Sequence, residues 1–221
     1  MEDSRPHGPA ETPNFGPPST PRLAAGIVLL RRGGKHSERA LEVLMLKRSE
    51  EAKFMPGVWV FPGGAVDEAD GEGEPGYRAC AMRELAEEAG IELPAGEELV
   101  LFSRWITPEV ISTRFDAWFF LALAPAHTPP QADGTETTEA AWFQPAEALA
   151  SQEAGDLLLA FPTIHQLRWL SAFRTSDEAL AAYRGSDVES VTPRVLKDGD
   201  EHRIVLPGDP GYDDASPAES V

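Results

Sequence analysis

Apolar runs alternate with short polar stretches along the chain, and the period of each run predicts a strand or a helix. β-Branched and aromatic residues dominate the strand segments, whereas the helical segments carry apolar residues three or four positions apart. We expect strands at residues 23–32, 40–48, 98–107, 113–124 and 138–143, and helices at residues 76–89, 144–160, 162–173 and 177–183. Because strands, hairpins and helices interleave, the pattern predicts an α/β fold in which helices flank a mixed sheet.

The ends of the chain differ from its centre in composition. Residues 1–21 are rich in proline, glycine and polar residues, and we expect a disordered N-terminal segment there. Residues 22–185 hold the main domain. Residues 186–212 predict a C-terminal hairpin extension, turning at "KDGDE" and packed on that domain, and residues 213–221 predict a flexible tail.

Composition narrows the class of protein. A length of 221 residues suits one domain with tails, and the net charge of −18 argues against binding nucleic acid or an anionic membrane surface. The single cysteine, Cys80, excludes an internal disulfide and suits a reducing compartment. No secretory signal or membrane-spanning run is present, so a cytoplasmic protein is expected. Whether it forms a homodimer is left open.

Three glutamates share one face of the helix predicted at residues 76–89. At about 100° per residue, Glu84, Glu87 and Glu88 fall together, opposite Leu85 and the alanines. Each such like-charge pair opposes helix formation by roughly 0.2–0.5 kcal/mol. A hard divalent cation would make the cluster favourable, and Arg83 can brace Glu87 one turn away. The alternative is a solvated acidic face, which the helix alone does not exclude.

The sequence around this helix resembles the Nudix hydrolase family. "RELAEEAGI", from Arg83 to Ile91, matches the second half of the Nudix box, R-E-U-x-E-E-x-G-U with U aliphatic, and "FPGG" at Phe61–Gly64 is its usual entry. The family spacing places an acid at position 70, but here Arg83 comes five residues late, through "GEGEPG". The residues do not decide whether Asp70, Glu72 or Glu74 replaces the first glutamate of the box.

The resemblance implies a Nudix-type α/β/α sandwich and a metal-dependent reaction. Glu84, Glu87 and Glu88 would be metal ligands, with the carbonyl of Gly64 as a further ligand. Glu84 would also be the base for the attacking water, and Arg83 its orienting partner. The implied cofactor is Mg²⁺ or Mn²⁺, and the implied reaction is hydrolysis of a diphosphate joined to another group.

The stretch "LMLKRSEEAKFMPGVWVFPGG", Leu44–Gly64, resembles the coenzyme A diphosphatase branch of the family. This implies hydrolysis of coenzyme A or acyl-coenzyme A, with Arg48 and Lys53 binding substrate phosphates; the alternative for both is a solvated surface cation. Other readings are a Nudix diphosphatase for ADP-ribose, a dinucleotide or another nucleoside diphosphate derivative, and a Nudix-like module that binds a nucleotide without turnover.

The segment before Trp142 holds two candidates for a further carboxylate. Glu136 and Glu139 lie where many Nudix enzymes supply an additional carboxylate, although both can equally be surface residues. His165 and Cys80 are expected to be structural.

Overall fold

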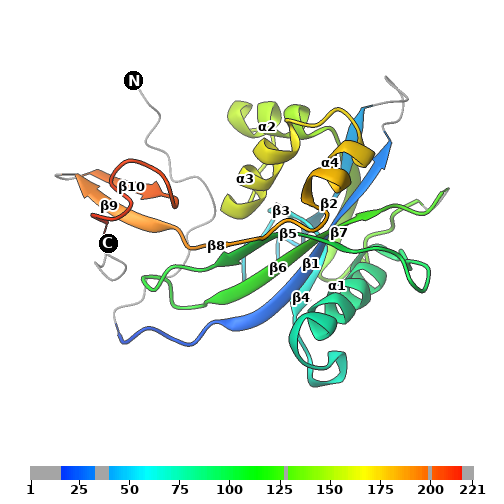
Figure 1. Cartoon of the computed structure of the whole chain (residues 1–221), viewed down its shortest axis with the longest axis horizontal. Coiled ribbons are helices and arrows are strands. Elements are labelled where there is room, and N and C mark those ends of the chain that lie inside the picture. The colour runs from blue at the N-terminus through cyan, green and yellow to red at the C-terminus, as the bar shows by residue number, and fades with distance from the viewer. Residues whose placement is uncertain (1–15, 33–39, 127–128, 199–200, 216–221) are drawn as a thin grey trace.

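A mixed sheet with helices on both faces forms the body of the protein. The computed structural model describes residues 16–32, 40–126, 129–198 and 201–215. The strands of the sheet are β1 (Arg22–Arg32), β2 (Leu41–Arg48), β3 (Trp59–Val60), β4 (Gly63–Ala65), β5 (Val100–Ile106), β6 (Phe115–Leu123), β7 (Thr137–Phe143) and β8 (Ser190–Val191). The helices are α1 (Gly73–Ala89), α2 (Pro145–Ala154), α3 (Phe161–Leu170) and α4 (Ser176–Tyr183), with the 3₁₀ turn η1 (Glu68–Asp70). Helix α1 lies on one side of the sheet and α2, α3 and α4 lie on the other, which confirms the α/β/α sandwich (Figure 1).

The strand order is β3-β2-β1-β6-β5-β8, with β4 paired to β1 and β7 paired to β2. The pairs β1–β6 and β5–β8 are parallel and the others are antiparallel, as expected for a mixed sheet. Alternate residues of β1 fill two cores: Ile27 and Leu29 pack on the α1 side, and Val28 and Leu30 on the side of α2 to α4. Burial on both faces explains why this central strand is almost continuously apolar.

Three helix boundaries differ by three or more residues from the sequence prediction, and one of them is the end of α3 at Leu170 in place of residue 173. Helix α1 begins at Gly73, three residues before the predicted start, and ends as predicted at Gly90, which is left-handed with φ 64°. The segment predicted as a helix to residue 160 ends at Ala154, because Gly155 adopts φ 82° and stops α2. The predicted inward face of α1 is confirmed, since Leu85, Ala81 and Ala89 are fully buried.

The central strands separate where the candidate site lies. β1 pairs with β2 only near Leu30–Arg32, and its other half pairs with β4. The segment Phe61–Gly64 therefore crosses from β3, beside β2, to β4, beside β1. It is anchored by a hydrogen bond from the amide of Ile27 to the carbonyl of Pro62, at 2.9 Å. This crossing delivers two glycines to the surface of α1, with which β4 packs.

The C-terminal segment forms the expected hairpin. β9 (Arg194–Asp198) and β10 (Glu201–Val205) pair antiparallel as a separate two-stranded sheet, seen to one side of the main sheet in Figure 1. The centre of its turn lies outside the described residues, as does most of the two predicted terminal segments; of residues 1–21 and 213–221, only 16–21 and 213–215 are described. The proposed domain boundaries thus stay predictions. No helix within the described ranges is long and apolar enough to cross a bilayer.

Candidate active site

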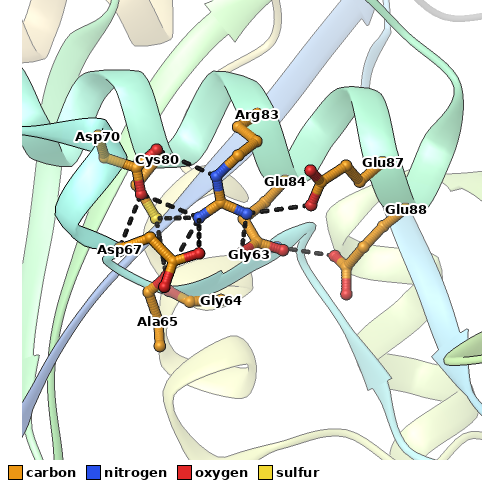
Figure 2. A network of polar contacts seen from close by, with 10 residues as sticks. All are labelled: Gly63, Gly64, Ala65, Asp67, Asp70, Cys80, Arg83, Glu84, Glu87 and Glu88. Atoms are coloured by element: carbon orange, nitrogen blue, oxygen red, sulfur yellow. Dashed lines mark hydrogen bonds and ion pairs between the residues drawn. The ribbon is translucent and has the colours of Figure 1, made fainter.

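Arg83 lies at the centre of a network of carboxylates (Figure 2). Its Nε donates to Asp70 Oδ1 at 3.0 Å and its Nη2 to Asp70 Oδ2 at 2.9 Å, a bidentate pair in which the Asp70 side chain is only 4% exposed. These hydrogen bonds hold the pKa of Asp70 below its ordinary value and raise the pKa of Arg83. Of the three acids in the inserted loop, Asp70 is the one that reaches Arg83, whereas Glu74 pairs with Arg78.

The same guanidinium orders two glutamates of α1. Nη1 of Arg83 donates to Glu84 Oε1 at 2.8 Å and to Glu87 Oε2 at 3.0 Å. The contact to Glu87 is the i,i+4 brace expected from the sequence. The two carboxylates differ in exposure, since the Glu84 side chain is 14% exposed and the Glu87 side chain 60%. Arg83 thus fixes one inward and one outward carboxylate.

Gly63 and Gly64 press directly against the glutamates of α1. The amide of Gly63 donates to Glu88 Oε2 at 2.9 Å. A Cβ atom on Gly64 would lie 2.5 Å from Cδ of Glu84 and 2.8 Å from its Oε2, so any side chain there would overlap the carboxylate. Close approach of backbone to carboxylate is the physical reason for glycine at position 64.

Burial makes these two carboxylates unusual acids. It raises the pKa of Glu88 to about 7, opposed by the Gly63 amide and reinforced by the charge of Glu84. Burial also raises the pKa of Glu84, against the effect of Arg83. One buried and one partly buried carboxylate close together are more stable as anions when a cation neutralises them.

The oxygen donors beside α1 have the chemistry that suits a divalent metal. Within the described ranges, no group of three Cys, His, Asp or Glu side chains is arranged to hold one. Glu87 points to Arg83, while Glu84 and Glu88 lie beside the Gly63–Gly64 backbone (Figure 2). Carboxylate and carbonyl oxygens are the ligands that Mg²⁺ and Mn²⁺ prefer. The chemistry of Glu84, Glu88 and the Gly64 carbonyl therefore fits such an ion, with Glu87 at the rim.

The two cationic residues predicted to bind substrate, Arg48 and Lys53, differ in their contacts. Arg48, at the end of β2, donates from Nε to the carbonyl of Phe54 at 2.9 Å, and its charge lowers the pKa of Glu88. Lys53 is exposed and makes no hydrogen bond or ion pair to any described residue. The Arg48 side chain is thus held by a hydrogen bond close to the carboxylates, whereas the Lys53 ammonium is exposed and unpaired among the described residues.

The two glutamates predicted before Trp142, Glu136 and Glu139, lie in different surroundings. Glu139 forms an exposed ion pair with Lys47 at 3.1 Å. Glu136 lies close enough to α1 for its charge to raise the pKa of both Glu84 and Glu88. Sequence reasoning did not single out Asp133, which shapes the loop before Glu136; the run "DGTET" carries the usual signal of an aspartate-capped turn.

Cys80 is fully buried below this network, and its thiol lies 3.5 Å from the carbonyl oxygen of Ala65. Burial, together with the charges of Asp70 and Glu84, raises its pKa to about 12. A thiol with such a pKa is a packing residue, in line with the expectation from the sequence.

Comparison with known proteins finds a match to one domain family over most of this chain. The model of the NUDIX domain matches residues 20–171. A Caenorhabditis elegans protein with the provisional name nudix hydrolase 7 is 29% identical, over 87% of this chain and 75% of its own length. Human acyl-coenzyme A diphosphatase NUDT19 is 25% identical, over 88% of this chain and 81% of its own length. The crystal structure of a NUDIX hydrolase from Alicyclobacillus acidocaldarius superposes with a TM-score of 0.68 and 25% identity, covering 76% of this chain and 99% of that one.

Proposed function

The chain belongs to the NUDIX family of hydrolases, and on that premise we propose that it hydrolyses the diphosphate bond of coenzyme A or acyl-coenzyme A. The products are adenosine 3′,5′-bisphosphate and 4′-phosphopantetheine or its acyl derivative. The observation that carries the hydrolytic part is the contact of Glu84 and Glu88 with the Gly63–Gly64 backbone, beside the Arg83–Asp70 pair. This is an anionic cradle with no salt-bridge partner for Glu88 among the described residues.

Glu84, Glu88 and the carbonyl of Gly64 would hold Mg²⁺ or Mn²⁺, with Glu87 as an outer ligand. When bound, the ion offsets the charge of the diphosphate and polarises water. In the proposed reaction the water oxygen bonds to phosphorus, the bridging P–O bond breaks, and Glu84 accepts the proton of the water. Arg83 holds Glu84 in place through its 2.8 Å hydrogen bond, and Asp70 holds Arg83.

The substrate assignment rests on the segment that precedes the glycines. Leu44–Gly64 has the pattern of coenzyme A diphosphatases, and the human relative carries the name acyl-coenzyme A diphosphatase. Coenzyme A differs from ADP-ribose in bearing a 3′-phosphate as well as the diphosphate. A fixed cation beside Glu88, Arg48, suits the shared diphosphate, and an unpaired exposed cation, Lys53, suits the extra phosphate.

The test compares coenzyme A, dephospho-coenzyme A and ADP-ribose as substrates of the wild type and Lys53→Met. A charge-assisted phosphate contact is worth about 1.5–3 kcal/mol, so kcat/KM for coenzyme A should fall about 10- to 150-fold. The two substrates that lack the 3′-phosphate should change little. Lys47→Met is the matched control, since Lys47 is a neighbouring cation already paired with Glu139.

Arg48→Met should lower kcat/KM for all three substrates alike. Because Arg48 also donates a hydrogen bond to the carbonyl of Phe54, the thermal unfolding of Arg48→Met must be measured as well, to separate a loss of stability from a loss of substrate binding. Equal losses for Lys53→Met on all substrates would move Lys53 to the diphosphate. A wild type that turns over ADP-ribose but not coenzyme A would overturn the substrate assignment and leave the hydrolase intact.

A further inference from the structure

Asp133 organises the loop that carries Glu136. Its Oδ1 accepts hydrogen bonds from the amides of Thr135 at 2.7 Å and Glu136 at 2.8 Å, and its Oδ2 accepts from the amide of Thr137 at 2.9 Å. The hydroxyl of Thr135 also donates to Oδ1. Three successive amides thus converge on one carboxylate, which fixes the backbone from Gly134 to Thr137.

The same loop is fastened to the end of the glutamate helix. The amide of Gln131 donates to the carbonyl of Ala89 at 2.9 Å. The hydroxyl of Thr137 is fully buried, 2.7 Å from Asp133 Oδ2 and 3.2 Å from the carbonyl oxygen of Glu88. With one proton, it donates to one of these oxygens at a time. The loop therefore satisfies the carbonyl of Ala89 at the C-terminus of α1, and the carbonyl of Glu88 whenever the Thr137 hydroxyl donates to it; a helix leaves both without partners of its own.

Glu136 is held on both sides of its backbone. Its amide donates to Asp133, and its carbonyl accepts from the amide of Ser49 at 2.8 Å, at the end of β2. Its side chain remains exposed, yet its charge acts on Glu84 and Glu88. An exposed carboxylate is thus carried by a hydrogen-bonded backbone, and its charge reaches Glu84 and Glu88.

We propose that Asp133 is a positioning residue, which, with Thr137, fixes Glu136 beside the Glu84–Glu88 pair so that its carboxylate serves the bound cation and the hydrolytic reaction. The role of Glu136 rests on the proposed function; the loop structure does not. Hydrogen bonds from Thr135 and Thr137 outweigh the effect of burial and hold the pKa of Asp133 well below its ordinary value. The Asp133 carboxylate is therefore ionised throughout the neutral pH range.

A double-mutant cycle separates positioning from simple loop stability. The variants are Asp133→Asn, Glu136→Gln and the double variant, each assayed for kcat, KM and the Mn²⁺ dissociation constant. Removing a residue that orients a metal site costs about 10- to 100-fold in activity or metal affinity, so each single variant should lose that much. KM should stay within about threefold. Once Glu136 is neutral, Asp133→Asn should cost less than about twofold more.

Two controls accompany the cycle. Asp209 also caps a turn, accepting the amide of Leu206 at 2.8 Å, so Asp209→Asn should leave kcat unchanged. Thr137→Ser keeps the hydroxyl and should retain activity, whereas Thr137→Val should lose it in proportion to Asp133→Asn. In the metal-free protein, hydrogen exchange of the amides of residues 135–137 should quicken in Asp133→Asn and not in Glu136→Gln.

The outcomes are distinct. Additive losses, with Asp133→Asn as costly in the Glu136→Gln background, would show that Asp133 acts without Glu136 and would overturn the proposal. Unchanged activity and Mn²⁺ affinity despite faster exchange would do the same. If the wild type hydrolyses no diphosphate, the proposed function fails, and non-additive Mn²⁺ affinities would still support the positioning role.

Discussion

Replacing Gly64 with alanine would put a methyl group where the Glu84 carboxylate lies. The new Cβ would be 2.5 Å from Cδ of Glu84, whereas carbon atoms in contact are normally about 3.5–4.0 Å apart. The carboxylate must therefore withdraw by about 1 Å. Gly64 does not have a positive φ, so the backbone itself accommodates alanine.

The displacement should harm catalysis far more than folding. The clash is with the end of a long side chain that can rotate away, so the free energy of unfolding should change by less than about 1 kcal/mol. A misplacement of about 1 Å at a reacting group can cost about 100-fold in rate. We therefore expect Gly64→Ala to lower kcat about 100-fold at saturating Mn²⁺, while urea unfolding stays nearly unchanged.

Gly63→Ala is the contrasting variant. Its Cβ would lie 2.7 Å from the carbonyl oxygen of Ala25 and 2.7 Å from Cα of Gly26, which are backbone atoms of β1. The strand cannot rotate away, so a stability loss of roughly 1–3 kcal/mol is expected. Full activity in Gly64→Ala would refute the reasoning, because it would mean that the observed position of Glu84 is not used. Global destabilisation in Gly64→Ala would mean that the carboxylate cannot yield.

Three further predictions follow from the same contacts. Arg83→Lys loses the planar fork that joins Asp70, Glu84 and Glu87, so steady-state kcat/KM should fall roughly 10- to 100-fold; a smaller effect would leave Arg83 only a surface role. Mn²⁺ at about 100 times its dissociation constant should stabilise the fold by about 2.7 kcal/mol and raise Tm by roughly 5–10 °C in calorimetry. This rise in Tm should vanish in Glu88→Gln, and a chelator should abolish turnover by the wild type. Burial and the charge of Arg168 lower the pKa of His165 to about 4, opposed by Asp209. Between about pH 6.5 and 4 the unfolded state therefore binds a proton that the folded state does not, and the free energy of unfolding falls as pH falls, by roughly 3 kcal/mol at most. His165→Phe should remove this pH dependence from the free energy measured by urea unfolding, and an unchanged pH dependence would exclude His165 as its cause.

The regular elements followed closely from the sequence because their signals are local. The central strands are apolar on both faces, and the apolar and charged faces of α1 follow from helical periodicity alone. The short β3 and β4 escaped notice, since two or three residues around "FPGG" carry no periodicity. Their pairing depends on β1 and β2 separating, which is a tertiary property.

The arrangement within the candidate site could be read only in part. Spacing placed Glu84, Glu87 and Glu88 on one face and paired Glu87 with Arg83. The contact of Glu84 and Glu88 with the Gly63–Gly64 backbone depends instead on the tertiary path of β4. Choosing Asp70 among the loop acids required the path of η1, which an insertion obscures in sequence. The contribution of Asp133 comes from three backbone amides, and backbone amides have no identity in a sequence.

Product analysis of coenzyme A incubated with the wild type and with Glu88→Gln tests the central claim most directly. With Mn²⁺ present, mass spectrometry should find adenosine 3′,5′-bisphosphate and 4′-phosphopantetheine from the wild type. Glu88→Gln, with its fold intact by circular dichroism, should form both at least 100-fold more slowly, because a buried carboxylate in contact with Gly63 is lost. Equal product formation by the two proteins, or products that arise without cleavage of the diphosphate, would contradict the account.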